Sequence, residues 1–426
     1  MIGKKIHNFA RDLWPINRSI TGEGVRETLK HIQKHLPELK IHRIASGKKV
    51  FDWTIPDEWS VKDAWIKTPS GEKICDFKKN NLHLLGYSSN IKKKITLSEL
   101  SRNLYSLPKQ KNAIPYVTSY YKKKWGFCIT EKQRKLLKKG NYEVFIDSNL
   151  FKGFLNYGEL LIKGSSKKEI FLSTYICHPS MANNEVSGIA VTTYLAKWIK
   201  DLKKTKYSYR IIFIPETIGS IAYLSKNLKI MKDNIIAGFN VTCVGDDRAY
   251  SFLPSRKGNT ISDIVGKHTL KWLDKKYIEY SWLERGSDER QYCSPHIDLP
   301  IVSLMRSKYN EYPEYHTSLD NLVNVVTPKG LEGGYNLLKL AIETVEKNCY
   351  PIITVYGEPQ LGKRGLYPTL SKVNSTKEIK LMMNLITWSD GNHSLLEIAE
   401  NSNVPIWKLY AILEKLIRKK LIKLKK

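Results

Sequence analysis

Between residues 170 and 347, four apolar runs alternate with four helix-like segments. Continuous runs rich in Ile, Val and Phe are typical of strands that are buried on both faces. Strands that alternate with helices form a mainly parallel sheet with helices on both faces. The pattern therefore predicts an α/β core whose strand–helix pairs are 170–176 with 186–201, 209–215 with 220–228, 236–245 with 260–273, and 300–305 with 329–347.

Two helical segments and then a β-rich region precede these strand–helix pairs. Residues 5–36 have helical periodicity in two pieces, which are separated by a loop containing Pro, Asn and Gly. From about residue 39 to residue 130, short alternating runs between turn residues predict a small β domain. We therefore assign residues 1–38 and 131–352 to the α/β core, and residues 39–130 to an inserted β-rich domain.

The last part of the chain has a different pattern again. A linker rich in Pro and Gly is expected over residues 353–374, followed by helices at 379–388, 394–401 and 405–420 and a strand at 421–424. Ser394 and Glu397 have the spacing of a capping box. Three short helices with a turn before the third predict a winged helix-turn-helix over residues 375–426. Such a domain binds DNA or contacts a protein partner, and both interpretations stay open.

The net charge of the chain does not by itself indicate a nucleic-acid-binding protein. The net charge is +29, but its lysines extend along the whole chain beside much Ile and Asn, which is typical of an AT-rich genome. We therefore do not expect nucleic acid as the main partner, although an anionic partner such as RNA, a nucleotide-sugar or a phosphorylated lipid stays an alternative. The runs 92–94 and 120–125 are the candidate contact segments for it.

Hydropathy, the N-terminal residues and the cysteine spacing give further expectations. No segment reaches the roughly 18 uninterrupted apolar residues of a membrane span, and the charged N-terminus does not resemble a secretory signal. The six cysteines form no CxxC pair, which argues against a disulfide framework or a thiolate zinc site. We expect a cytoplasmic protein without a membrane span.

Polar residues that could take part in catalysis or bind a metal follow several of the predicted strands. His178 follows the first strand, with Asn184 and Glu185 in the turn before the next helix. Glu216 follows the second strand, and His316 follows the fourth. Because the carboxyl ends of parallel strands meet at one edge of a sheet, these side chains are expected to lie together there.

The same segments resemble the zinc-dependent aminopeptidases of the bacterial leucyl aminopeptidase and glutamate carboxypeptidase type. The resemblance covers the α/β core and rests on Ala-Asn-Asn-Glu-Val-Ser-Gly at 182–188, Pro-Glu-Thr-Ile-Gly at 215–219, Gly-Ser-Asp-Glu at 286–289 and the segment 307–320. The whole chain resembles a bacterial branch of aminopeptidase-like proteins with an inserted β domain and a C-terminal winged helix. Members of that branch often accompany genes of polysaccharide or surface-glycan biosynthesis.

The resemblance implies roles for individual residues. His178 and His316 match the two histidine ligands, and Glu216 matches the general base. Where the family has three metal-binding carboxylates, however, this chain has Asn184, Thr217 and Thr242. A dication with so few charged ligands is poorly neutralised, so we expect one zinc ion rather than two. The third ligand is Glu185, Asp288 or Asp247, and we choose Glu185.

Together these features predict a zinc-dependent aminopeptidase-like hydrolase that cleaves an amide bond of a small peptide or aminoacyl substrate. Glu216 would be the base and Tyr292 the oxyanion donor, while Asn184, Arg285 and Asp288 would contact the substrate. Two alternatives stay open. One is an N-deacylase for an amino-sugar precursor, and the other is a catalytically degenerate binding module whose winged helix contacts a partner or nucleic acid. A homo-oligomer formed through the inserted domain or the winged helix is also expected.

Overall fold

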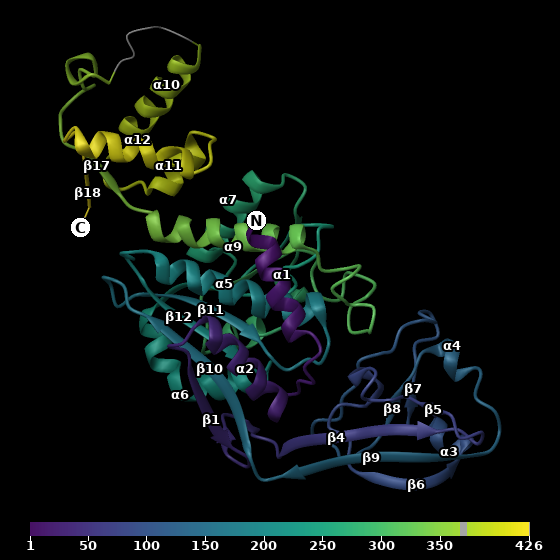
Figure 1. Cartoon of the computed structure of the whole chain (residues 1–426). Helices are drawn as coiled ribbons and strands as arrows, with labels where there is room; N and C mark the ends of the chain where they lie inside the picture. The colour runs from purple at the N-terminus through teal and green to yellow at the C-terminus, as the bar shows by residue number, and fades with distance from the viewer. Residues whose placement is uncertain (367–372, 426) are drawn as a thin grey trace. The chain divides into compact units, whose positions relative to one another are not determined.

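The structure is a computed structural model that describes residues 1–366 and 373–425 (Figure 1). Residues 367–372 of the predicted linker lie outside the described residues. The chain divides into two compact units, one of Met1–Asp263 with Lys276–Leu338 and one of Ile264–Lys275 with Lys339–Lys426.

The first unit is built on a mixed, mostly parallel sheet of eight strands. The central strands β12, β11, β13 and β16 are parallel to one another, whereas β1 and β10 at one edge are antiparallel. In spatial order the strands are β1 (Lys40–Ala45), β10 (Phe154–Ile162), β12 (Ser208–Ile214), β11 (Glu169–Tyr175), β13 (Ile235–Asn240), β16 (Ile301–Met305), β14 (Ser251–Leu253) and β15 (Ile278–Glu279). The predicted fold class is therefore confirmed.

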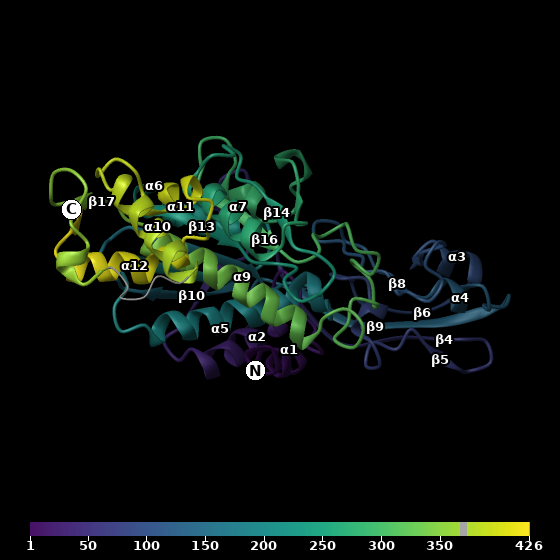
Figure 2. The ribbon, with the colours of Figure 1, turned by 90° about the horizontal axis from the view of Figure 1, so that it is seen from above.

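Helices cover both faces of this sheet (Figure 2). Helices α1 (Ile2–Leu13), α2 (Glu23–His35) and α5 (Ser187–Asp201) lie on one face, and α6 (Ile218–Asn234) lies on the other. All seven residues of β11 are buried, as expected for a strand between two helical layers. The remaining helices outside the C-terminal domain are α3 (Leu97–Ser101), α4 (Glu131–Arg134), α7 (Ile261–Leu273), α8 (Glu289–Tyr292) and α9 (Pro328–Lys347).

Strand β11 is the point at which the order of the sheet reverses. The chain passes from β11 to β12 on one side and then to β13 on the other. Loops that leave such neighbouring strands in opposite directions open a crevice beyond their carboxyl ends. Gly188 lets α5 begin close to β13, because a Cβ atom there would lie 2.5 Å from the carbonyl oxygen of Val241.

The inserted region forms a separate antiparallel sheet in the order β5 (Lys73–Ile74), β4 (Glu58–Lys67), β9 (Asn141–Phe151) and β6 (Ile91–Thr96). Figure 1 shows β4 and β9 running side by side. Strand β9, which the sequence places in the core, pairs with this small sheet, and β1, which it places in the insert, pairs with the large one. Alternation predicts which face of a strand is buried but does not identify its partner.

Short elements complete the insert, and one of its loops reaches the core. The short strands are β2 (Lys49–Val50), β3 (Trp53–Thr54), β7 (Leu104–Tyr105) and β8 (Phe127–Cys128). The backbone N–H of Tyr116 donates to the carbonyl of His316 at 2.9 Å, and Ser318 N–H donates to Ile114 at the same distance. The loop therefore joins the last polar segment of the core.

The second unit contains the predicted C-terminal domain. Helices α10 (Val373–Thr387), α11 (Leu395–Asn401) and α12 (Trp407–Arg418) are followed by β18 (Ile422–Leu424), which pairs antiparallel with β17 (Pro351–Ile353). The predicted capping box of Ser394 and Glu397 is present. This arrangement is the predicted winged helix-turn-helix, extended by a strand that precedes the predicted linker. Within residues 1–366 and 373–425, no helix is long and apolar enough to cross a membrane.

Candidate functional site

A pocket of about 340 Å³ lies beyond the carboxyl ends of β11 and β12. It contains three of the residues that the sequence predicts for the site, His178, Glu216 and His316. It also contains aromatic residues from the insert. The complete lining is Ile20, Trp53, Tyr116, Thr118, Tyr120, Tyr121, Cys177, His178, Glu216, Thr217, Ile218, Arg290 and His316.

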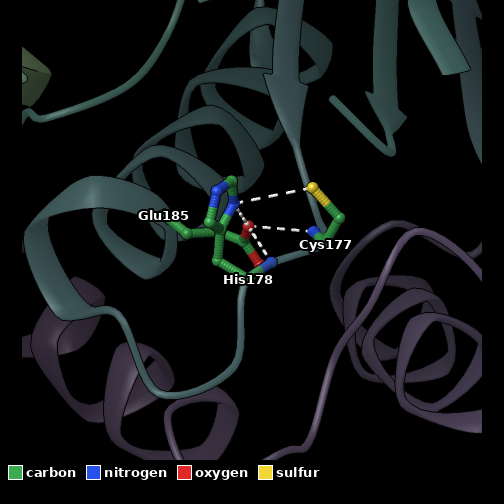
Figure 3. Close-up of side chains that lie close together, drawn as sticks. All are labelled: Cys177, His178 and Glu185. Carbon is green, nitrogen blue, oxygen red and sulfur yellow. Dashed lines mark hydrogen bonds and ion pairs between the residues drawn. The ribbon is translucent and has the colours of Figure 1, made fainter. Parts of the chain in front are cut away.

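Glu185 forms a hydrogen bond with ring nitrogen Nδ1 of His178 (Figure 3). Its Nδ1 lies 2.8 Å from Glu185 Oε2, which also accepts the backbone N–H of Cys177 at 2.9 Å and that of His178 at 2.5 Å. The other oxygen, Oε1, forms an ion pair with Arg18 Nε at 2.6 Å, and both side chains of this pair are fully buried. Four donors therefore saturate the Glu185 carboxylate and orient the imidazole.

The local backbone brings Glu185 to this position. Residues Ala182–Val186 form one π-helical turn before α5, a feature that is frequent at functional sites. The Asp320 carboxylate accepts hydrogen bonds from the first backbone N–H groups of this turn. Its Oδ1 accepts from Asn183 at 2.7 Å and its Oδ2 from Asn184 at 3.0 Å. Burial raises the pKa of Asp320 to about 6.

Glu216 faces the other nitrogen of His178. Its Oε2 lies 3.7 Å from His178 Nε2, and its side chain is 20% exposed. Burial raises the pKa of Glu216, whereas the nearby charges of His178 and Arg290 oppose this rise. A partly exposed carboxylate with a raised pKa is suited to proton transfer.

His316 presents an unpaired ring nitrogen. Its Nε2 is buried and has no hydrogen-bond partner among the described residues. The ring stacks on Tyr315 with centroids 3.9 Å apart and meets Tyr116 edge-on at 5.1 Å. Burial lowers the pKa of His316 to about 3, so the imidazole is neutral at physiological pH. A neutral imidazole with a buried nitrogen that has no partner among the described residues is suited to bind a metal.

The position expected for a second metal is occupied by neutral hydrogen bonds. Asn184 Nδ2 donates to the hydroxyl of Tyr175 at 2.7 Å, and that hydroxyl lies 2.5 Å from Thr242 Oγ1. Thr242 Oγ1 in turn donates to the carbonyl of Asn184 at 2.8 Å. None of these three side chains carries a charge, and Oδ1 of Asn184 is buried without a hydrogen-bond partner among the described residues. A second dication here would be poorly neutralised, so the position does not fit one.

Five predicted residues do not line the pocket. Asn184 and Glu185 form the hydrogen bonds described above, so the predicted substrate contact of Asn184 is replaced by a contact with Tyr175. The other three are Tyr292, Arg285 and Asp288. Tyr292 is 0% exposed and its hydroxyl pairs with Ser173 Oγ at 2.7 Å, so the hydroxyl is not available to a substrate. Arg285 is exposed and packs over the Trp282 ring at 5.2 Å. Asp288 is also 0% exposed, and its Oδ1 accepts Thr217 N–H at 2.7 Å and Ser220 Oγ–H at 2.8 Å. Its predicted contact with substrate is therefore replaced by a contact with the start of α6.

The pocket contains residues that the sequence did not single out. Tyr116 and Tyr120 come from the insert, and their hydroxyl oxygens lie 2.8 Å apart. Arg290 donates through Nη2 to Thr217 Oγ1 at 2.8 Å. Arg290 lies between the predicted substrate contact Asp288 and the predicted oxyanion donor Tyr292, and Tyr120 lies in the candidate contact run 120–125. Arg18, which is more than 150 positions from Glu185, has no local signal in the sequence.

Two sets of donors could hold a metal. Ligand atoms of Cys177, His178 and Glu185 lie within 4.8 Å of one another, but Arg18 and two backbone N–H groups already engage the carboxylate. The other set is His178 and His316, whose ring centroids are 5.3 Å apart, with Glu216 beside them. The second set has free nitrogen lone pairs and lies in the pocket, so it fits one metal ion better.

Comparison with known proteins places the chain in a family. Residues 7–348 match the family described as "Domain of unknown function (DUF4910)", and residues 348–424 match a winged helix-turn-helix family. A protein of Clostridium acetobutylicum named "Putative polysaccharide biosynthesis protein with aminopeptidase-like domain" is 44% identical over 99% of this chain and 96% of its own length.

Solved structures agree with this assignment. A crystal structure of a "putative peptidase" from Clostridium acetobutylicum has a TM-score of 0.94 and 44% identity, and covers 100% of this chain and 97% of that one. BSAP, a zinc aminopeptidase from Bacillus subtilis, has a TM-score of 0.56 at 12% identity over 80% of this chain and 95% of that one, which shows a shared fold. The chain therefore belongs to the DUF4910 family, with an aminopeptidase-like fold joined to a C-terminal winged helix.

Proposed function

We propose that the chain is a zinc-dependent hydrolase that cleaves an amide bond of a small peptide or aminoacyl substrate. The observation that carries this proposal is that Nε2 of His316, in the same pocket as His178 and Glu216, is buried and has no partner in the part of the chain that the structure describes. A buried polar atom without a partner is costly unless a ligand satisfies it. One zinc ion held by His178 and His316 would do so.

The surroundings of His178 support a ligand role. A histidine that binds zinc commonly donates its other ring N–H to a carboxylate, which sets the tautomer and the ring orientation. Glu185 accepts from Nδ1 in this way and leaves Nε2 directed to the pocket side that contains Glu216. We therefore propose that Glu185, predicted from the sequence as a ligand, positions His178 instead.

The pocket residues would divide the chemistry among them. When bound, zinc would supply Lewis-acid chemistry, which polarises a carbonyl group. Glu216 would take a proton from the attacking water and return it to the leaving amine, for which its raised pKa is suited. Its side chain lines the pocket and is partly exposed, as both transfers require.

The tyrosine pair would replace Tyr292 as the oxyanion donor. Only one hydroxyl of Tyr116 and Tyr120 can donate to the other, so the acceptor of that bond keeps its own O–H for a substrate. Burial holds the pKa of both hydroxyls well above the usual value, so they remain protonated. Donors that are already in place stabilise an oxyanion without reorganisation.

An amino-sugar N-deacylase is the second candidate. Four aromatic side chains, Trp53, Tyr116, Tyr120 and Tyr121, line a pocket of about 340 Å³, which is large enough for a single sugar ring. The name of the Clostridium acetobutylicum relative refers to polysaccharide biosynthesis. Both candidates require the same metal and the same base.

Metal content and turnover test the proposal. The purified full-length protein, reconstituted with zinc and dialysed, should bind one equivalent by elemental analysis, and His178→Ala and His316→Ala should each lose it. His31→Ala, on α2 outside the pocket, is the control. Glu216→Gln should keep zinc but abolish hydrolysis of aminoacyl amides or N-acetylated amino sugars. Zinc content well below one equivalent in the wild type, or full turnover in Glu216→Gln, contradicts the proposal.

A further inference from the structure

We infer that this pocket selects substrates that carry a carboxylate beside the acylated amine, and that Arg290 binds that carboxylate. The inference deepens the proposed function and rests on it, because it assumes that the pocket holds the substrate. It narrows the substrates of the two candidate functions to an N-acyl amino acid or an N-acylated sugar acid.

The guanidinium group of Arg290 forms no ion pair within the described residues, although its charge opposes the rise in the pKa of Glu216 in the same pocket. The residue lies in α8 and its side chain is exposed. Among residues 1–366 and 373–425, no carboxylate oxygen lies within 4.0 Å of its nitrogens, and its one hydrogen bond runs from Nη2 to the neutral hydroxyl of Thr217 at 2.8 Å. A guanidinium has five N–H donors in a fork that matches a carboxylate, so most of its donors remain for a ligand.

The contact with Thr217 holds the guanidinium at the pocket. Thr217 has a φ of 63° at the start of α6, and its backbone N–H donates to Asp288 Oδ1 at 2.7 Å. Asp288 is fully buried and also accepts Ser220 Oγ–H at 2.8 Å. The partner of Arg290 therefore belongs to a rigid part of the fold, which reduces the entropic cost of binding an anion.

The other charges in the pocket favour an anionic ligand over a cationic one. Glu216 is the one carboxylate in the pocket lining, and it is assigned to proton transfer. A substrate with a free α-ammonium group would need a second carboxylate as its partner, and the lining residues offer none. A substrate whose amine is acylated has no such charge, whereas its carboxylate would pair with Arg290.

The aromatic residues at the pocket suit a flat, partly apolar body beside that carboxylate. The rings of Trp53 and Tyr121 are 6.0 Å apart, and the two residues are 38% and 57% exposed. Exposed aromatic rings at a pocket contribute apolar contact area. An aromatic amino acid or a sugar ring would have this shape, and both can carry an N-acyl group and a carboxylate.

Binding of matched acid and neutral ligands tests the inference. We would titrate the full-length Glu216→Gln protein by calorimetry with N-acetyltyrosine against N-acetyltyrosinamide, and with N-acetylmuramic acid against N-acetylglucosamine. The acid of one pair should bind roughly 10-fold more tightly or better, as expected for hydrogen bonds to charged groups. The pair that shows the preference distinguishes an amino acid from a sugar as the source of the carboxylate.

Variants assign the preference to Arg290. Arg290→Met should abolish it, and Arg290→Lys should keep part of it because a point charge without the planar fork remains. Arg285 lies five residues before Arg290, packs on the Trp282 ring and does not line the pocket, so Arg285→Met should keep the preference. Arg102→Met controls for the loss of one surface charge. Equal binding of acid and neutral ligands, a preference that survives Arg290→Met, or no binding of any ligand at millimolar concentration overturns the inference.

The same experiment separates this inference from the proposed function. Because binding is measured in a variant without turnover, a carboxylate preference that depends on Arg290 supports the inference even if the wild type hydrolyses none of these ligands. Conversely, zinc-dependent hydrolysis of neutral amides with equal binding of acids and amides would support the hydrolase and overturn the role of Arg290.

Discussion

The Nδ1 atom of His178 lies 2.8 Å from Oε2 of Glu185, a carboxylate whose second oxygen pairs with Arg18 at 2.6 Å. All three side chains are buried. A buried carboxylate needs such a cation and such donors to remain charged. The arrangement gives His178 a fixed orientation before any ligand arrives.

Replacement of the Glu185 carboxylate by an amide should therefore weaken metal binding. In Glu185→Gln, we expect zinc affinity to fall roughly 10- to 100-fold, because the group that orients the ligating ring loses its charge. Competition with a chromophoric chelator measures the affinity. Arg18→Met is the companion variant, which should lose roughly 3–5 kcal/mol of stability because it leaves a buried carboxylate unpaired. Unchanged zinc affinity in Glu185→Gln would remove Glu185 from this role.

Restoring one acid at the second metal position should not restore a second metal. Asn184→Asp places a carboxylate where Nδ2 now donates to the hydroxyl of Tyr175. That hydroxyl is already hydrogen-bonded to Thr242. We expect a loss of roughly 1–3 kcal/mol from the broken network and a zinc content that does not increase. Urea unfolding and elemental analysis measure the two effects. Two equivalents of zinc in this variant would show that the neutral network is not what limits the site.

Asp288 should make stability depend on pH. Burial and the charge of Glu216 raise the pKa of Asp288 from 3.8 to about 8. Between these values the folded state holds a proton that the unfolded state releases, so stability falls as pH rises. Asp288→Asn lacks this titration. In metal-free protein, the stability of the variant relative to the wild type should therefore increase between about pH 5 and about pH 8, as measured by urea unfolding. A constant difference across this range would contradict the raised pKa.

His268, in the second unit, should also make the stability of the fold depend on pH, but in the opposite direction to Asp288. Its Nε2 accepts the backbone N–H of Ile406 at 3.0 Å, and its Nδ1 contacts Glu400. Burial lowers the pKa of His268 below 6.5 despite Glu400. Its contribution is fully present above the unfolded-state value and is lost as pH falls through the range below 6.5.

His268→Leu should remove this titration. The variant leaves the Ile406 N–H without its acceptor and removes the His268 contact of Glu400, which keeps its ion pair with Lys271. We therefore expect a loss of roughly 1–3 kcal/mol at neutral pH. Thermal unfolding at several pH values measures the loss. His393→Leu, at a more exposed histidine of the same unit, is the control. The same pH slope in His268→Leu and the wild type would assign the effect to another group.

The winged helix should not read DNA through the start of α12. In helix-turn-helix proteins, residues at the start of the recognition helix contact base edges. Here Ile406 is 0% exposed and its N–H is bonded to His268. We expect only weak binding through the basic end of α12, with a steep loss of affinity as salt increases. Fluorescence anisotropy with mixed-sequence duplexes checks this, and sequence-dependent binding that persists at physiological salt would contradict it.

Part of the site could be predicted because its residues follow consecutive strands. His178 and Glu216 come directly after β11 and β12, and parallel neighbours place their carboxyl ends at one edge. The spacing therefore brings these two side chains together without any knowledge of packing. The same reasoning cannot place Tyr292, because a residue on a short helix faces either the pocket or the core. It faces Ser173 in the core.

The sequence by itself determined the order of strands and helices, the winged helix and the edge of the sheet that carries the polar residues. These properties depend on local periodicity and on the apolar character of each run. Tertiary structure alone decided that Arg18 neutralises Glu185, that Tyr116 packs beside both histidines, and that Arg290 rather than Arg285 lines the pocket. Each of these depends on which distant segments meet and on which way a side chain turns. Spacing along the chain does not encode either property, because long-range packing selects one of many compatible arrangements.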